Sequence, residues 1–415
     1  MFDYDKWNEI FQSIAKHKLR AGLTAFGVFW GIFMLVLLMG GGSGLENGAT
    51  AGFDIAKNTV FVWTRRTSLP YKGFQPGRFI NLTNDDTRLL KESMPEAKVV
   101  SPRMSLGGEF TIEHADRTAS FSVYGDSPDF IQVKPMDIVQ GRFLNPMDIE
   151  ERRKVAVIGG RVHEVLFPEG ENPIGTFITI KGIPFKVIGV FKSNSRNQEA
   201  MEDEQAIFTP ITGFQTAFNY GNYIGWFAML PQDGIPAATI EQKAKSILAK
   251  RHSVNPEDKR AFGSANIEEE YKQVQGIFTG IRGFSWLVAI GTIIAGVVGV
   301  GNIMMIIVKE RTKEIGIRKS MGATPWSIIS MILQEAVFLT GISGYLGLLV
   351  GCILVTGVGY AVNEFNLQSD FFGAPEIHFG TALIAIVVLL FAGVIAGLIP
   401  GIRAANINPV EALRD

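Results

Sequence analysis

Hydrophobic residues in this chain gather in four long stretches that contain no Asp, Glu, Lys or Arg, one near the beginning and three in the last third. The stretches are 21–45, 283–308, 336–363 and 379–402. Even the shortest would be about 36 Å long as a helix, which exceeds the roughly 30 Å thickness of a bilayer's hydrocarbon core. The pattern therefore predicts four membrane-spanning helices, with a large folded domain inserted between the first and the second.

These spans divide the chain into segments that alternate between apolar and polar. We expect, in order, an N-terminal segment (1–20), the first span (21–45), an inserted domain (46–275), a helical stalk (267–283), the second span (284–308), a loop (309–325), the third span (326–363), a short loop (364–378), the fourth span (379–402) and a tail (403–415). The N-terminal segment has apolar residues at helical spacing, which predicts an amphipathic helix that either anchors the first span or contacts a partner.

The net charge of −1 is uninformative, but the distribution of Lys and Arg along the chain is not. Basic residues cluster in the N-terminal segment and in the loop after the second span, whereas 364–378 contains acidic residues and no Lys or Arg. Because Lys and Arg favour the cytoplasmic side, this predicts cytoplasmic termini, a cytoplasmic 309–325 loop and an inserted domain on the outer side. No charged residue lies in the middle of a span, which argues against an ion-driven carrier.

The inserted domain shows strand and helix patterns in mixed order, which predicts an α+β fold in two lobes. Expected strands lie at 59–63, 110–112, 120–124, 154–158, 177–180 and 185–190, and expected helices at 83–94 and 240–251. Two pairs of these strands flank short turns and predict hairpins. The polar segment 191–206 is expected to be a flexible tip or linker.

The residues just before the second span predict that its helix continues outward as a stalk. Apolar residues recur there mostly at spacings of three or four, as in a coiled-coil seam: Ile267, Tyr271, Val274, Ile277, Phe278 and Ile281. Such a seam needs a partner helix, most simply the outward continuation of the first span. Glycines at 40, 41, 42, 44 and 48 weaken that continuation, since each costs up to about 1 kcal/mol of helix propensity.

The loop between the second and third spans contains the pattern of a short capped helix. Thr312 is expected to cap its beginning, and Glu314 and Arg318 are four residues apart and predict an ion pair. Gly322 is placed to end this helix, and Thr324 to cap the next one. From the residues alone, the short helix is either a docking site for a partner or a basic elbow held by lipid phosphates.

Four parts of the sequence carry motifs that point to one protein family. The most specific is the run Lys-Glu-Arg-Thr-Lys-Glu-Ile-Gly-Ile-Arg-Lys over 309–319, followed by Gly322-Ala323 and by Glu335. The others are Leu19-Arg20-Ala21-Gly22-Leu23-Thr24, Asn172-Pro173-Ile174-Gly175, and the ending over 400–414. Together they resemble the MacB-type, or type VII, permeases of ABC transporters, with a periplasmic core domain and an FtsX-like C-terminal membrane region. The resemblance covers essentially the whole chain.

The resemblance implies a permease subunit that dimerises with a second copy or a paralogue and has no catalytic, cofactor or metal site of its own. A separate cytoplasmic ATPase would bind ATP and Mg²⁺, since no G-x-x-x-x-G-K-[ST] phosphate loop occurs in the sequence. ATP hydrolysis would move the periplasmic domain, a mechanotransmission cycle used for efflux or export. The ATPase-coupling loop would comprise Lys309, Glu310, Arg311, Lys313, Glu314, Ile315, Gly316, Ile317, Arg318, Lys319 and Gly322.

The resemblance also places the chain in the bacterial inner membrane, in contact with lipid and without a nucleic-acid partner. It leaves open whether a periplasmic adaptor and an outer-membrane channel join the complex. We expect charge reversal at Glu314 or Arg318 to uncouple ATPase stimulation without unfolding the protein.

Three other functions stay open at this point. The chain could be a sensor or scaffold whose loop binds a regulator without ATP turnover. A lipoprotein-releasing permease would have the same architecture, although that family's loop lacks the Glu-Ile-Gly-Ile-Arg run. A membrane enzyme is disfavoured, because the five histidines are not at metal-binding spacing and no nucleophile–base pair is evident.

Overall fold

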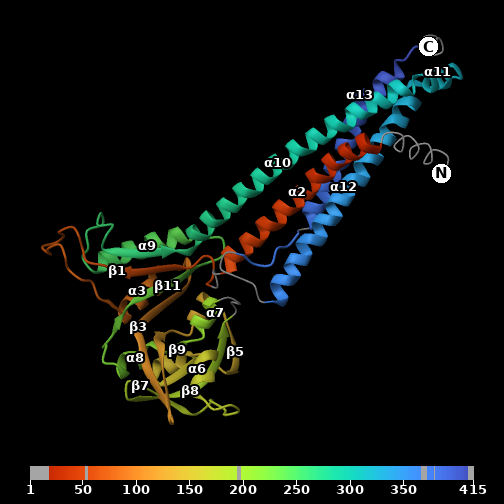
Figure 1. Ribbon diagram of the computed structural model, residues 1–415. Helices are drawn as coiled ribbons and strands as arrows, with labels where there is room; N and C mark the ends of the chain where they lie inside the picture. Colours follow the sequence, from red (N-terminus) through yellow and green to blue (C-terminus); the bar gives the residue numbers. More distant parts are fainter. Residues whose placement is uncertain (1–17, 52–54, 194–197, 366–371, 378, 410–415) are drawn as a thin grey trace. The chain divides into compact units, whose positions relative to one another are not determined.

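The computed structural model describes residues 18–51, 55–193, 198–365, 372–377 and 379–409, and the predicted amphipathic segment therefore lies largely outside the described residues. The chain forms two compact units (Figure 1). One, here called the membrane unit, comprises Met1–Ala49 and Gly276–Asp415, and the other, the inserted domain, comprises Thr50–Gln275. Each unit is described by itself below.

The membrane unit contains the four predicted spanning helices. They are α2 (Lys18–Ala51), α10 (Ile267–Glu310), α12 (Pro325–Glu364) and α13 (Phe379–Ala405). Each is long and apolar enough to cross a bilayer, which confirms the predicted fold class of one N-terminal and three C-terminal spans. A short helix, α11 (Thr312–Ser320), connects α10 to α12. The helices extend beyond the uncharged stretches because charged residues are accommodated in the turns outside the apolar core.

Small residues allow the spanning helices to approach one another closely. A Cβ at Gly27 of α2 would lie 3.7 Å from the Cα of Gly296 in α10. A Cβ at Gly347 of α12 would lie only 2.5 Å from the carbonyl oxygen of Phe29 in α2. The hydrophobic effect does not drive helices together in lipid, so their association depends on close packing of this kind, backbone against backbone.

The outward continuation of the first span is helical despite its glycines. α2 runs to Ala51, and its Glu46 carboxylate lies 3.4 Å from the Arg282 guanidinium of α10. The Ser43 hydroxyl donates a 2.7 Å hydrogen bond to the carbonyl of Glu376. Contacts with neighbouring segments therefore outweigh the low helix propensity of glycine.

The predicted stalk is part of one uninterrupted helix, α10, so its helical continuation is confirmed. In the membrane unit Phe278 is buried, whereas Ile277 and Ile281 are exposed. At the start of α10, in the inserted domain, the Tyr271 hydroxyl accepts a 2.9 Å hydrogen bond from Lys57. The described contacts do not form one continuous apolar seam, and the coiled-coil role of the six seam residues stays a prediction.

The inserted domain is built around a ten-stranded sheet with the order β12-β1-β11-β3-β4-β9-β6-β8-β5, in which β7 pairs with β3 and β8. Its strands are β1 (Val60–Thr64), β3 (Ala97–His114), β4 (Arg117–Asp126), β5 (Met136–Gly141), β6 (Val155–Gly159), β7 (Phe177–Ile180), β8 (Ile183–Ser193), β9 (Ala206–Pro210), β11 (Trp226–Pro231) and β12 (Phe262–Asn266). A separate pair joins β2 (Leu82–Thr83) to β10 (Tyr223–Ile224).

Helices cover this sheet, namely α3 (Asn84–Ser93), α4 (Phe130–Val133), α5 (Pro146–Glu150), α6 (Gly160–Leu166), α7 (Gln198–Asp203), α8 (Ile211–Ala217) and α9 (Ala237–Arg251). The division of this domain into two lobes stays a prediction, and its buried apolar residues form separate clusters. One contains Val60 and Ile240 and involves β1 and α9, and another contains Ile158 and Phe185 and involves β6 and β8. The long strand β3 contributes to both clusters, and it pairs with β11 before Ser105 and with β4 on both sides of an irregularity there.

Most of the local predictions for this domain are confirmed, including both hairpins and both helices. The prediction that 191–206 is a flexible linker is wrong for its described residues. Residues 191–193 complete β8, residues 198–203 form α7, and Ala206 begins β9. The Ser193 amide donates a 3.1 Å hydrogen bond to the Glu204 carboxylate, so polar residues in this segment satisfy local backbone groups instead of facing only water.

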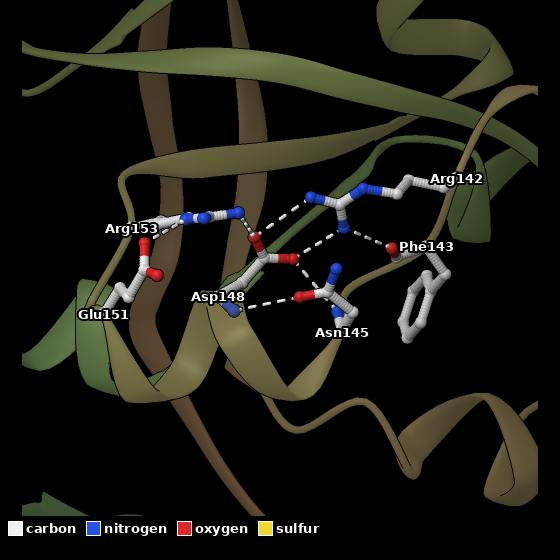
Figure 2. A network of polar contacts seen from close by, with 6 residues as sticks. All are labelled: Arg142, Phe143, Asn145, Asp148, Glu151 and Arg153. Carbon is white, nitrogen blue, oxygen red and sulfur yellow. Dashed lines mark hydrogen bonds and ion pairs between the residues drawn. The ribbon is translucent and has the colours of Figure 1, made fainter.

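A buried carboxylate holds the turn that follows β5 (Figure 2). Asp148 in α5 lies 2.6 and 3.0 Å from two nitrogens of Arg142, and 3.3 Å from Arg153. It also accepts a 3.0 Å hydrogen bond from the amide of Asn145, whose side chain caps α5 in return. Burial is the largest single effect and would raise the pKa of Asp148, but the hydrogen bonds and charge of Arg142, the Asn145 amide and Arg153 together outweigh it, and the pKa lies below its usual value.

A second buried ion pair lies where β3, β4, β9 and β11 meet. The Arg103 guanidinium is 3.1 Å from the Asp126 carboxylate. Its central carbon also lies 4.1 Å from the ring centre of Tyr124 and 4.2 Å from that of Phe130. Complete burial raises the pKa of Asp126 to about 7, although the Arg103 charge acts in the opposite direction. This pair is not evident from the sequence, because its members come from separate strands.

Candidate docking site

The loop between the second and third spans is almost entirely helical. Only Arg311 separates α10 from α11, and Thr312 is the first residue of α11, not its cap. Its hydroxyl donates to the carbonyls of Val308 and Lys309, at 3.2 and 2.8 Å. The expected N-cap role of Thr312 is therefore wrong. Because the two helices almost adjoin, Thr312 satisfies carbonyl groups left open at the end of α10 instead of amides at the start of α11.

The other two predicted helix ends are confirmed. Gly322 has a φ of +95° after the end of α11, a conformation that glycine adopts without strain. The Ala323 amide donates a 3.0 Å hydrogen bond to the carbonyl of Arg318, which closes the helix end. The Thr324 side chain accepts from the amide of Ser327 at 3.3 Å and caps α12, with Pro325 in its first turn.

One side of α11 is packed into the membrane unit. Ile315 is completely buried in an apolar cluster with residues of α10, α12 and α13, including Ile303, Ile332 and Ala404. Gly316 is buried beside it. Burial of an isoleucine side chain stabilises by roughly 1.5–3 kcal/mol, so this contact fixes α11 against the ends of three spanning helices.

Ion pairs fix the same side of α11. The Arg311 guanidinium lies 2.8 Å from the Glu335 carboxylate of α12, which is only 6% exposed, and 3.5 Å from Glu314. Glu314 is in turn 2.9 Å from Arg318, which confirms the predicted ion pair. Arg311, Glu314 and Arg318 are thus engaged within the chain, and their primary effect is to hold the helix in place.

Lys319 ties α11 to the last spanning helix. Its ammonium group donates to the carbonyls of Ala405 and Ile407, both at 2.7 Å. These carbonyls lie at and just beyond the end of α13, where a cation is favoured by the helix dipole and by unpaired carbonyl groups. Lys319 therefore anchors the loop, and its charged group is directed at this chain.

The opposite side of α11, together with the residue that follows it, presents three exposed residues at spacings of four, Lys313, Ile317 and Met321, which we call the docking stripe. Residues four apart lie on the same face of a helix. Ile317 is 45% exposed and Met321 is 76% exposed. Met321 also borders a cavity of about 480 Å³ between α11 and the start of α12, together with Ala323, Ile328 and Met331. An exposed apolar face beside a cavity is suited to receive a partner.

The structure therefore divides the predicted coupling residues into two groups. The anchoring group faces the membrane unit and contains Arg311, Glu314, Ile315, Gly316, Arg318 and Lys319. The exposed group contains Lys309, Glu310, Lys313, Ile317 and Gly322. Met321, which the structure places in the docking stripe, is not among the residues predicted from the sequence. The sequence does contain an indication of its position, because Met321 is a large apolar residue four positions after Ile317 and directly before Gly322, which ends the helix.

Two family models match this chain, one over the first span and most of the inserted domain, and one over the last three spans and the loop. The model of the family described as MacB-like periplasmic core domain matches residues 21–247, more than half of the chain. The model described as FtsX-like permease C-terminal matches residues 286–409, which include the loop and its docking stripe. The chain belongs to the MacB-like family of ABC transporter permeases.

Relatives with curated descriptions are similar over almost the whole chain. The macrolide export ATP-binding/permease protein MacB of Vibrio parahaemolyticus is 27% identical over 407 residues, covering 97% of this chain and 58% of its own length. The protein of the same name from Neisseria meningitidis serogroup B is 29% identical over 420 residues, covering 99% and 62%. The chain thus spans about 60% of the length of these relatives.

Solved structures are similar to part of the chain. The periplasmic region of MacB from Actinobacillus actinomycetemcomitans is 19% identical, with a TM-score of 0.43, and covers 54% of this chain and 94% of its own. The extracellular domain of the noncanonic ABC-type transporter YknZ from Gram-positive bacteria is 20% identical, with a TM-score of 0.41, covering 50% and 100%.

Proposed function

We propose that this chain is the permease subunit of an ATP-driven exporter, and that α11 is the element on which a cytoplasmic ATPase docks. The observation that carries the proposal is the two-sided character of α11. Its inner side is fixed by Ile315, by the Arg311–Glu335 ion pair and by Lys319, while Ile317 and Met321 of the docking stripe stay exposed. A rigid helix with an exposed apolar face is a common recognition element for a groove on a partner.

The fixed side of α11 gives the docking stripe a means of transmitting force. Arg318 of α11 contacts Met331 of α12, and Lys319 of α11 contacts Ala405 at the end of α13. A single helix, α10, runs from Ile267 in the inserted domain to Glu310 at the start of this loop. We infer that displacement of α11 by the ATPase moves the spanning helices and, through α10, the inserted domain.

The side of the membrane on which the loop lies follows from the distribution of basic residues. We assign the loop and both termini to the cytoplasm of a bacterium, and the inserted domain to the outer side of its inner membrane, because Lys and Arg cluster at the loop. ATP and Mg²⁺ are assigned to the partner ATPase, since the matching family models are those of the periplasmic core and of the permease. The relatives' names support export as the direction of transport.

We further propose that the working unit contains two permease copies, either two of this chain or this chain and a paralogue. A symmetric pair would present two docking stripes, one to each copy of a dimeric ATPase. A periplasmic adaptor and an outer-membrane channel would be additional partners of the inserted domain.

The test combines purification with a matched pair of substitutions. The tagged chain is purified from its native membrane in mild detergent, and co-purifying proteins with ATP-binding-cassette motifs are identified and assayed for ATP hydrolysis. Met321→Glu places a charge in the docking stripe and is expected to remove the ATPase. Met201→Glu makes the same change at a 65% exposed methionine of the inserted domain and is expected to retain it. Retention of the ATPase by Met321→Glu would refute the assigned docking face.

A further inference from the structure

A groove lies between the second and fourth spanning helices, on a part of the membrane unit that the docking stripe does not use. It has a volume of about 900 Å³ and is lined by residues 293–305 of α10 and 388–403 of α13. Its floor contains the buried residues Ile293, Ala392 and Ala396. The small side chains of the two alanines leave room between the helices. Larger exposed residues such as Val298 and Ile395 form its walls.

The groove is apolar along most of its length but polar at the end near the 309–325 loop. There Asn302 of α10 and Arg403 of α13 line opposite walls. Within the part of the chain that the structure describes, neither side chain has a hydrogen-bond or ion-pair partner. An amide and a guanidinium at the edge of the hydrocarbon core are costly unless something satisfies them. The exposed Lys309 lies one helical turn beyond the lining residue Met305 and adds a positive charge near this end.

The length of the groove matches one leaflet of a bilayer. From Val388 to Arg403 the helix α13 rises about 22 Å, at roughly 1.5 Å per residue. Half of a bilayer including its headgroups measures about 20–22 Å. A ligand that fills the groove would therefore be apolar over most of this length and would carry its anionic group at Arg403.

We propose that the groove between α10 and α13 binds an anionic phospholipid of the leaflet on the side of the 309–325 loop. The acyl chain lies over Ile293, Ala392 and Ala396, and the phosphate lies at Arg403. The Asn302 amide donates a hydrogen bond to the ester region of the lipid. This lipid site is distinct from the proposed ATPase contact and does not depend on it.

The experiment uses the purified full chain in lipid nanodiscs that contain a trace of photoactivatable lipid. Phosphatidylglycerol carrying a diazirine on one acyl chain is compared with phosphatidylcholine carrying the same chain, and adducts are located by mass spectrometry. We expect adducts to concentrate on the groove walls, at residues such as Ile294 and Ile395. The yield with phosphatidylglycerol should exceed that with phosphatidylcholine about five-fold, as expected for one basic residue at an anionic headgroup.

Two substitutions make the assignment specific. Arg403→Gln removes the headgroup partner and should lower the phosphatidylglycerol yield to that of phosphatidylcholine. Lys313→Gln removes one positive charge from the loop outside the groove and should leave the preference unchanged. Equal yields for the two lipids in the unmodified protein would overturn the proposal. So would adducts no denser in the groove than on the exposed Ile353 of α12. Absence of adducts from the groove would also overturn the proposal.

Discussion

The guanidinium of Arg311, the residue that separates the second span from the short helix α11, lies 2.8 Å from the Glu335 carboxylate of the third span. Glu335 is 6% exposed, so this ion pair is largely removed from water. It joins Arg311 of the loop to a residue of a spanning helix 24 positions further along the chain. The pair therefore fixes the position of α11, and with it the direction in which the docking stripe faces.

Breaking this ion pair on one side is predicted to destabilise the protein more than removing both partners. Arg311→Met or Glu335→Leu alone leaves a poorly solvated charge, which typically costs about 3–5 kcal/mol when the pair is buried. The double substitution replaces both charges by apolar groups and should recover most of that loss. The measurement is the thermal unfolding midpoint of each variant in detergent, compared as a double-mutant cycle. Additive losses in the double variant would contradict a direct coupling of the two residues.

The close contact at Gly347 in the membrane unit predicts that alanine there lowers stability, and Gly357 in the same helix provides the control. Gly347→Ala in α12 would place a Cβ 2.5 Å from the Phe29 carbonyl oxygen, so α2 and α12 must move apart, at a cost of about 1–3 kcal/mol. Gly357→Ala in the same helix meets no atom within 4 Å and should be neutral or slightly stabilising. Thermal stability in detergent distinguishes the two. Equal midpoints for the two variants would show that α2 and α12 do not pack at Gly347.

The Asp126 carboxyl predicts a pH dependence for the inserted domain. Its pKa rises from 3.8 to about 7 in the folded state because of burial. Between these values the folded state binds the proton and the unfolded state does not, so the contribution of Asp126 to stability falls as pH rises through this window. Asp126→Asn should therefore gain stability relative to the unmodified protein as pH increases from 5 to 8. A difference between the two proteins that stays constant with pH would contradict the raised pKa.

The Asp148 carboxyl predicts that the stability of the inserted domain changes with pH in the opposite direction, and at lower pH. Its pKa is below the usual value, because the combined interactions with Arg142, the Asn145 amide and Arg153 outweigh the effect of burial. Its stabilising contribution is present above pH 4 and is lost as pH falls below that value. Asp148→Asn should cost about 1.5–3 kcal/mol near neutral pH, the range for a hydrogen bond to a charged group. Asp116→Asn, at an exposed turn, serves as the control in urea unfolding experiments and should change little.

Much of the fold follows from local sequence patterns. The four spans are evident because an uncharged stretch of that length has few other structures available to it. Both hairpins and the helix ends at Gly322 and Thr324 depend on residues within a few positions of each other. The same holds for the ion pair between Glu314 and Arg318, which are one turn apart. In each of these cases the chemistry is contained in a short segment, and the sequence alone predicts it correctly.

The structure departs from the sequence analysis where distant segments meet. Thr312 was expected to act as an N-cap, but the end of α10 lies so close that its hydroxyl donates to Lys309 instead. The polar segment 191–206 resembles a linker in composition, and its contacts with Glu204 become visible only once β8 and α7 are placed. Similarly, four of the nine residues of α11 are charged and they are spread along the helix, so its sequence pattern does not reveal which charges face the membrane unit. Anchoring and docking residues can be separated only by the tertiary packing.

The most direct test of the docking stripe is site-specific cross-linking to the ATPase. Cys352 is the only cysteine in the chain, so Cys352→Ser gives a background into which single cysteines can be introduced at Met321, at Ile317 and, as a control, at Met201. Each is labelled with a short photoactivatable reagent and irradiated in the presence of the co-purified ATPase. We predict cross-links to the ATPase from positions 317 and 321 and none from position 201. If the ATPase co-purifies but positions 317 and 321 give no cross-link, α11 does not dock it.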